Sequence, residues 1–126
     1  MFNNCKNTKT QGTVGLGSAI DYFVRNNYIV SIPLNDSQDY DLIVDGEEGL
    51  KRVQVRTTSH KRHGSYVVNL SVSGGSATRR SQTRKVGTDM KYDLLYVLCE
   101  DNTRYLIPKC VLGRREKTLN KDFKID

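Results

Sequence analysis

Several features that mark specialised classes of protein are scarce or missing in this sequence. There is no tryptophan, and the 126 residues include only two prolines and three cysteines. Cys5, Cys99 and Cys110 are far apart and form no Cys-x-x-Cys pair, which excludes a disulfide scaffold or a four-cysteine zinc site within one chain. No apolar run approaches the about 18 residues of a membrane span, and residues 1–12 lack the apolar stretch of a signal peptide. We therefore expect a cytoplasmic protein without a membrane partner.

Acidic side chains are scarce in the middle third of the chain. Residues 51–91 carry ten Lys or Arg and one Asp, a net charge of +9, whereas residues 1–50 have a net charge of −4 and the whole chain +6. Such a basic segment is typical of proteins that bind a polyanion, most commonly a nucleic acid. The less specific alternative is a solvated basic face. With 37% hydrophobic residues, the length fits one globular domain over residues 1–126.

The hydrophobic pattern predicts one helix followed by a series of strands. Apolar residues recur at three- and four-residue spacing over residues 12–27, with Thr10 as the candidate N-cap. Strands are expected at residues 28–32, 40–45, 50–57, 65–72, 92–99 and 103–107, loops at 58–64 and 73–91, and a short helix near 109–112 before a basic C-terminal tail. The most apolar strand, 92–99, should be central. This order predicts an α/β fold with an N-terminal helix and a mixed β-sheet.

Residues 40–57 predict a β-hairpin that brings three polar side chains together. If residues 46–49 form the loop, paired residue numbers sum to 95, which places Asp41 directly opposite Gln54. Strand alternation puts Asp41, Gln54 and Arg56 on one face. Carboxylate and amide oxygens suit Mg²⁺, and a neighbouring cation stabilises charge that develops on a phosphoryl oxygen. The spacing fits an ordinary Asp–Arg surface contact equally well, and a β-bulge would change the register.

The hairpin also resembles a known family. YDLIVD at residues 40–45, followed by VQVRT at residues 53–57, resembles the PD-(D/E)XK nuclease superfamily, above all its small intron-encoded homing endonucleases. Those proteins have an Asp at a strand start, then Glu or Gln, any residue, and Lys on the next strand. The resemblance continues through GTVGLGSAIDYFVRNNYIVSIPL before the hairpin and YDLLYVLCEDNTRYLIPK after it. It implies a restriction-endonuclease-like fold and Mg²⁺-dependent hydrolysis of phosphodiester bonds in duplex DNA.

The resemblance implies a role for each polar residue of the hairpin. Asp41 corresponds to the metal-binding acid, Gln54 to a second metal ligand, and the Val55 carbonyl to a third. Arg56 stands where the family has the Lys that contacts the nucleophile and the scissile phosphate. The implied catalytic residues are therefore Asp41, Gln54 and Arg56, with Mg²⁺ as the cofactor.

Two positions depart from the family pattern. Arg56 remains protonated, and its planar guanidinium differs in geometry from a compact ammonium. Leu16 stands where many members carry a helix Glu. Asp21 lies five residues further on, about 140° round the helix, so it does not replace that acid. These departures favour the alternative of a DNA-binding domain with this fold and little or no nuclease activity.

Contacts to DNA are expected mainly from the basic middle segment. The candidate DNA-binding residues are Lys61, Arg62, Arg79, Arg80, Arg84, Lys85 and Lys91. We interpret His60 and His63 as loop residues that add phosphate contacts, because no third metal ligand lies nearby. Cutting both DNA strands requires two sites, which predicts a symmetric homo-oligomer, a dimer or a tetramer. A basic β-rich module that binds RNA or protein is a third possibility, in which the hairpin cluster is coincidental.

Overall fold

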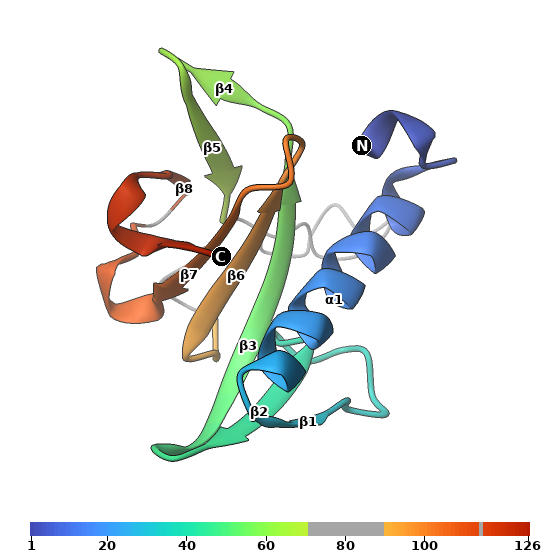
Figure 1. Cartoon of the computed structure of the whole chain (residues 1–126), viewed down its shortest axis with the longest axis vertical. Coiled ribbons are helices and arrows are strands. Elements are labelled where there is room, and N and C mark those ends of the chain that lie inside the picture. Colours follow the sequence, from blue (N-terminus) through green and yellow to red (C-terminus); the bar gives the residue numbers. More distant parts are fainter. Residues whose placement is uncertain (71–89, 114) are drawn as a thin grey trace, which may run out of the picture.

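The described part of the chain forms one long helix, two β-sheets and three short 3₁₀ helices (Figure 1). The computed structural model describes residues 1–70, 90–113 and 115–126. In chain order the described elements are a 3₁₀ helix (Phe2–Asn4), α1 (Thr8–Arg25), β1 (Ile29–Ser31), β2 (Leu42–Gly46), β3 (Gly49–Thr58), β4 (Lys61–Arg62), β5 (Ser65–Asn69), β6 (Leu94–Cys99), β7 (Arg104–Pro108), a 3₁₀ helix (Lys109–Val111), β8 (Glu116–Thr118), a 3₁₀ helix (Lys121–Phe123) and β9 (Lys124–Ile125).

The predicted helix is confirmed, but it begins four residues earlier than expected. Asn7 is the N-cap, and its Oδ1 accepts a hydrogen bond from the Thr10 amide at 2.9 Å. Thr10 therefore lies inside the first turn, and its prediction as the cap was wrong. The helix ends at Arg25, and Asn27 adopts a left-handed φ of 69°, a conformation that stops helices.

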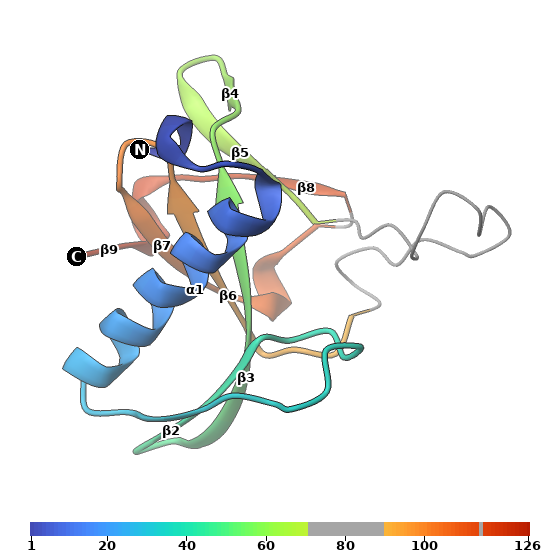
Figure 2. The ribbon, with the colours of Figure 1, turned by 90° about the vertical axis from the view of Figure 1, so that its right-hand side faces the viewer.

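The main sheet is mixed, as predicted, with the strand order β1-β2-β3-β6-β7-β9. β3 and β6 run parallel, and the other neighbours in this sheet are antiparallel. β6 lies near the middle and is almost entirely buried, which confirms the expected central position of the most apolar strand. Seen from the side of α1, the helix lies across the sheet (Figure 2).

A second sheet, β4-β5-β8, was not predicted from the sequence. The expected basic loop at residues 58–64 contains β4, which forms a hairpin with β5 around His63 and Gly64, both at positive φ. The expected C-terminal tail instead contributes two strands, because β8 pairs with β5 and β9 pairs with β7. These strands are two or three residues long, so their sequences carry almost no periodicity, and their pairing depends on partners distant in the chain.

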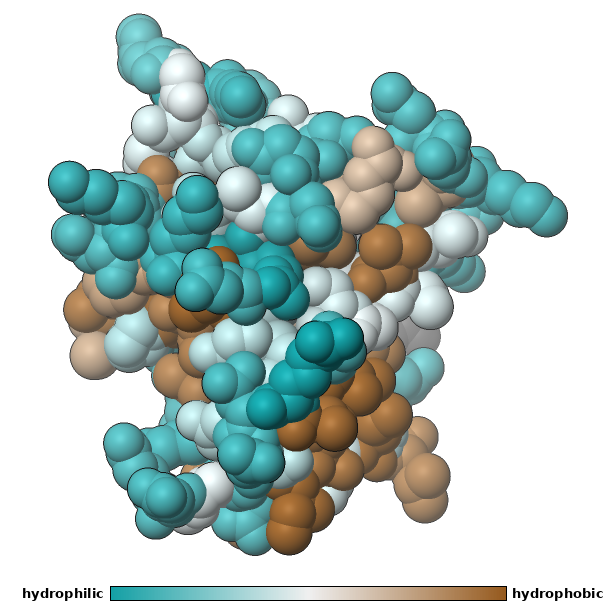
Figure 3. Space-filling view, viewed as in Figure 1, coloured by the Kyte–Doolittle hydropathy of each residue, from teal (hydrophilic) through white to brown (hydrophobic). Residues whose placement is uncertain are grey.

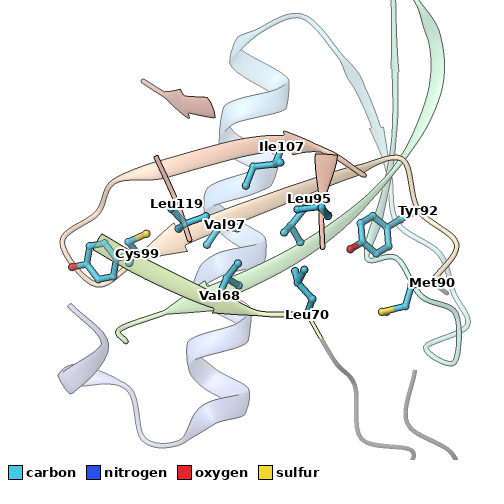
Figure 4. Close-up of a cluster of buried hydrophobic side chains, with 11 residues drawn as sticks. Val68, Leu70, Met90, Tyr92, Leu95, Val97, Cys99, Ile107 and Leu119 are labelled. Carbon is cyan, nitrogen blue, oxygen red and sulfur yellow. The ribbon is translucent and has the colours of Figure 1, made fainter. Parts of the chain in front are cut away.

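Two hydrophobic clusters pack on opposite faces of the main sheet. The first lies between α1 and the sheet and includes Phe23, Leu42, Val53 and Tyr96. The second lies between β5 and strands β6 and β7, where Val68 and Leu70 meet Leu95, Val97 and Ile107 (Figure 4). Cys99 belongs to this second cluster, as expected of a small buried hydrophobe, and burial raises the pKa of its thiol to about 11.

The surface seen in Figure 3 is divided between hydrophilic and hydrophobic regions. Hydrophobic residues gather in its lower half, over the C-terminal end of α1 and the strands near it. Exposed large hydrophobic side chains in these elements and their connections are Val24, Ile29, Ile32, Leu34 and Leu50. Among the described helices, none has the length and hydropathy needed to cross a membrane.

Candidate active site

β3 changes its pairing partner along its length, and only Val53 is paired with strands on both sides. Residues 49–53 pair with β2, whereas Gln54 and the residues after it pair only with β6. The carbonyls of Arg52 and Thr58 accept hydrogen bonds from Asp93 and Glu100 on the β6 side. Since backbone groups alternate along a strand, those of Val55 and Thr57 point toward the edge that β2 has left. We call this edge, from Val55 to Thr58, the open edge of β3.

The hairpin register was predicted correctly up to the point where the open edge begins. Paired residue numbers sum to 95 from Gly46 and Gly49 to Leu42 and Val53, although the turn has two residues and not four. At Asp41 the chain bends, and its amide donates to the Val53 carbonyl at 2.8 Å. This bond belongs to a register shifted by one residue, as at a β-bulge. The predicted direct opposition of Asp41 and Gln54 is therefore not formed.

Asp41 is instead fixed to both neighbours of Gln54. Its amide is bound to Val53, and its carboxylate Oδ2 accepts the Val55 amide at 2.8 Å. Burial raises the pKa of Asp41, while the Val55 amide and the positive charge of Arg56 oppose that rise. Its other oxygen, Oδ1, accepts no hydrogen bond from another described residue. One carboxylate oxygen is thus anchored to the backbone, and the second remains available at the open edge.

Gln54 supplies an unusual acceptor at the same place. Its Oε1 is buried and has no hydrogen-bond partner among the described residues. Leaving a buried polar atom unsatisfied costs about 1–3 kcal/mol, so such an atom requires an explanation. By strand alternation Gln54 and Arg56 lie on the sheet face opposite α1, since α1 contacts Val55 and Thr57 at Gly15.

These oxygens form a donor set that fits Mg²⁺. A carboxylate, an amide oxygen and the Val55 carbonyl are the hard ligands that Mg²⁺ prefers, and the ion commonly keeps several waters. Within residues 1–70, 90–113 and 115–126, no three His, Cys, Asp or Glu side chains cluster as a metal site. Asp41 would therefore supply the charge, and Gln54 and Val55 would supply neutral ligands.

Arg56 lies near the carboxylate without being locked to it. Burial lowers the pKa of the Arg56 guanidinium, and the negative charge of Asp41 opposes that change. Asp41 and Arg56 form no ion pair within 4 Å, as judged from the four ion pairs found between described residues. The positive charge is consequently held beside the site but is not neutralised by a direct contact.

The sequence analysis missed two neighbours of the site. Tyr92, at the start of the strand expected at residues 92–99, is 3% exposed and interacts electrostatically with Arg56. The parallel pairing of Val53 with Leu94 brings it there, and this pairing has no local signal. The second neighbour is Gln11 on α1, whose Nε2 donates to Thr57 Oγ1 at 2.9 Å.

Neither helix position considered for a family acid reaches Asp41. Leu16 packs into the hydrophobic cluster between α1 and the sheet. Asp21 is exposed, and its Oδ1 accepts Arg25 Nε at 2.9 Å. Neither of these two helix positions therefore contributes a carboxylate to the candidate site.

The candidate DNA-binding residues divide into described and undescribed positions. Lys61 and Arg62 lie on β4, where Lys61 Nζ is 4.8 Å from the Tyr66 ring centroid and Arg62 pairs with Glu116 at 3.0 Å. Lys91 is exposed, and its amide donates to Asp39 Oδ2 at 2.9 Å. The remaining candidates, which lie outside the described residues, are Arg79, Arg80, Arg84 and Lys85.

Comparison with known proteins identifies the family. The profile of the PD-(D/E)XK endonucleases matches residues 6–122, so the chain belongs to the PD-(D/E)XK endonuclease family. It is similar to the solved structure of a bacterial homing endonuclease, I-Ssp6803I, at 25% sequence identity and a TM-score of 0.64. That alignment covers 91% of this chain and 77% of the other. No curated protein sequence gives a significant match. The suspected family and the restriction-endonuclease-like α/β fold are thereby confirmed.

Proposed function

We propose that this protein is a Mg²⁺-dependent endonuclease, similar to homing endonucleases, that binds duplex DNA and hydrolyses its phosphodiester bonds. The observation that carries the proposal is the buried, unpartnered Oε1 of Gln54 beside the available carboxylate oxygen of Asp41. A purely structural hairpin gains nothing from an unsatisfied buried acceptor. In a PD-(D/E)XK endonuclease, such an acceptor can serve as a metal ligand.

The proposed roles follow from where each group is held. Asp41, Gln54 and the Val55 carbonyl would hold the ion, and a bound ion would supply polarisation of the phosphate and acidification of a water. The Val55 amide orients the Asp41 carboxylate by binding Oδ2, which leaves Oδ1 without a hydrogen bond from another described residue. Arg56 places a partly desolvated positive charge where negative charge develops on the phosphoryl oxygens. Because an Arg does not give up its proton, Arg56 stabilises charge and does not act as a base.

Duplex DNA and a second copy of the chain are the proposed partners. The net charge of +9 over residues 51–91 supports contacts to the phosphate backbone by Lys61, Arg62, Arg79, Arg80, Arg84, Lys85 and Lys91. Cleavage of both strands requires two copies of the Asp41 site, which supports a symmetric homo-oligomer. The exposed apolar side chains around Ile29 and Leu50 support contact between copies.

A second candidate is a DNA-binding domain of the same family with little or no nuclease activity. It is favoured by Arg56 in place of Lys and by Leu16 in the position expected for a helix acid. Arg56→Lys separates the two candidates. If the site hydrolyses DNA, the compact ammonium should raise the cleavage rate, because it fits beside the phosphate as the family residue does.

The experiment measures nicking of a supercoiled plasmid by wild-type protein, Arg56→Lys and Asp41→Asn at saturating DNA and matched stability. We expect cleavage with Mg²⁺ by the first two and none by Asp41→Asn. If wild-type protein and Arg56→Lys bind the plasmid but are inert with both Mg²⁺ and Mn²⁺, the DNA-binding candidate replaces the nuclease. Failure to bind duplex DNA at all would favour the RNA- or protein-binding module.

A further inference from the structure

A polar cleft lies beside the open edge of β3, next to the candidate active site. Its volume is about 510 Å³. It is walled by α1 on one side and by β5 and residues next to β8 on the other. The polar residues that line it include Gln11, Thr57, Ser59, His60, Asn69 and Arg115. The cleft therefore sits where β2 no longer covers β3, next to Arg56 in the chain.

The backbone spacing relates this cleft to the site. Val55 and Thr57 present their backbone groups to the same open edge. Two residues of a β-strand advance about 7 Å, which is comparable with the separation of neighbouring phosphates along one DNA strand. The Thr57 amide has no hydrogen-bond partner among the described residues. Its hydroxyl accepts Gln11 Nε2, so the hydroxyl proton remains free to donate.

The charge of the cleft suits an anion. Arg115 is exposed and takes part in none of the ion pairs between described residues, and the His60 imidazole adds a second side-chain donor. Glu116 also lines the cleft, but its carboxylate is paired with Arg62 at 3.0 Å. The donors that remain are an amide, hydroxyls, an imidazole and a guanidinium, which together form a set that binds phosphate oxygens.

We propose that this cleft binds the phosphate adjacent to the scissile one on the cleaved DNA strand. Thr57 donates from its amide and hydroxyl, and Arg115 and His60 approach from the opposite wall. The bound strand then runs along the open edge of β3 and is held at two successive phosphates. This inference rests on the proposed endonuclease function, which it extends by defining the direction of the strand across the site.

The first test measures binding without cleavage. Affinity for a 30-base-pair duplex is measured in EDTA over a series of salt concentrations for wild-type protein, Arg115→Gln, His60→Gln and Lys121→Gln. Lys121→Gln is the charge-matched control, because Lys121 is exposed on the 3₁₀ helix that contacts β7, which is two strands away from β3 in the sheet. We expect Arg115→Gln to weaken binding roughly tenfold and to reduce the slope of log K against log salt by about 0.9, with Lys121→Gln unchanged.

The second test identifies the phosphate. On a duplex whose cut has been mapped, neutral methylphosphonate replaces single phosphates on either side of the cut. One neighbouring replacement should slow wild-type protein about tenfold and have little further effect on Arg115→Gln. The inference is wrong if Arg115→Gln keeps the wild-type slope of log K against log salt. It is also wrong if the phosphate replacement whose effect disappears in Arg115→Gln is distant from the cut. Loss of cleavage in every variant with the binding result intact would instead overturn the nuclease proposal and leave the phosphate contact standing.

Discussion

The two halves of β3 share one strand but have opposite properties. Over residues 49–53 the strand pairs with β2, and at Val53, which is fully buried, it pairs with β6 as well. Over residues 54–58 one edge is open, and polar groups gather there: the bent Asp41, the unsatisfied Gln54 and the half-buried Arg56. The polar side chains of the candidate site thus gather where the pairing with β2 has stopped.

The two halves of β3 also differ in what they contribute to stability and to the candidate site. The half that pairs with β2 contributes apolar contacts, because Val53 and its partner Leu42 are fully buried. The open half retains a buried acceptor and a desolvated acid, each of which lowers the stability of the folded state. Substitutions in the two halves should therefore change stability in opposite directions.

The largest expected effect is on the paired half. Leu42→Ala removes a fully buried side chain opposite Val53 and should lower the free energy of unfolding by about 2–5 kcal/mol. Leu50→Ala, at a residue that is 69% exposed on β3, is the matched control and should change it by less than about 0.5 kcal/mol. Urea unfolding of both variants measures the difference. Equal losses would mean that burial of Leu42 does not distinguish its contribution to stability from that of exposed Leu50.

The next largest effect is on activity at the open half. Asp41→Asn keeps an oxygen that can accept the Val55 amide but removes the charge, so it should reduce the cleavage rate at least about 100-fold. Stability should change by less than about 1 kcal/mol. Asp45→Asn, at the exposed end of the same strand, should cleave like wild-type protein. Similar rates for the two variants would remove Asp41 from the chemistry.

Gln54→Met tests the buried acceptor. Replacing the amide by an apolar side chain of similar length removes the unsatisfied Oε1, so the unfolding free energy should rise by about 1–3 kcal/mol. The same change should abolish stabilisation by divalent metal. Wild-type protein at a Mn²⁺ concentration 100 times its Kd should gain about 2.7 kcal/mol over EDTA, and Gln54→Met should gain none. Destabilisation of Gln54→Met in EDTA would show that the amide is satisfied.

Two glycines of α1 test the open edge of β3 from the helix side of the sheet. A Cβ at Gly15 would lie 2.6 Å from Thr57 Cγ2, whereas one at Gly17 meets nothing within 4 Å. Gly15→Ala should therefore destabilise by about 1–3 kcal/mol and disturb the open edge, while Gly17→Ala should stabilise by about 0.5–1 kcal/mol. Thermal unfolding and plasmid nicking of the pair are the measurements. A stabilised Gly15→Ala would show that α1 can move away from Thr57.

The smallest effect concerns pH. Because burial raises the pKa of Asp41 above 3.8, the folded state binds this proton more tightly than the unfolded chain does. Its contribution to stability therefore falls as the pH rises from about 3.8 through the raised pKa. The difference in unfolding free energy between Asp41→Asn and wild-type protein should grow over that interval and then level off. Asp45→Asn is the reference variant, and a similar curve for both would contradict the assignment to Asp41.

The sequence predicted the features that are set by local periodicity. The apolar stripe of α1, the hairpin register and the buried β6 could all be found from residues close together in the chain. The start of α1 was missed because the Asn7 cap precedes the apolar stripe. Strands such as β8 and β9 were missed because two or three residues form a strand only when a distant partner is present.

The sequence predicted which residues form the candidate site better than it predicted how they are arranged. Asp41, Gln54 and Arg56 were identified from their spacing, but the bend at Asp41 shifts the register by one residue. Nothing in the run YDLIVD signals this bend. Tyr92 and Gln11 reach the site through the β3–β6 pairing and the packing of α1, which are contacts between distant segments. Residue types and their spacing along the chain therefore identify the candidate ligands, but not the residues that contact them from distant segments.

The parallel pairing of β3 with β6 has a consequence for how the protein folds. Arg52 and Asp93, which are bonded at the start of this pairing, are 41 residues apart in the chain. Closing so large a loop is slow, whereas the β2–β3 hairpin closes over a two-residue turn and can form early. During synthesis the hairpin that carries Asp41, Gln54 and Arg56 would emerge well before β6 is available. The order of synthesis would thus delay the site, so that the candidate site is complete only after most of the sheet has been translated.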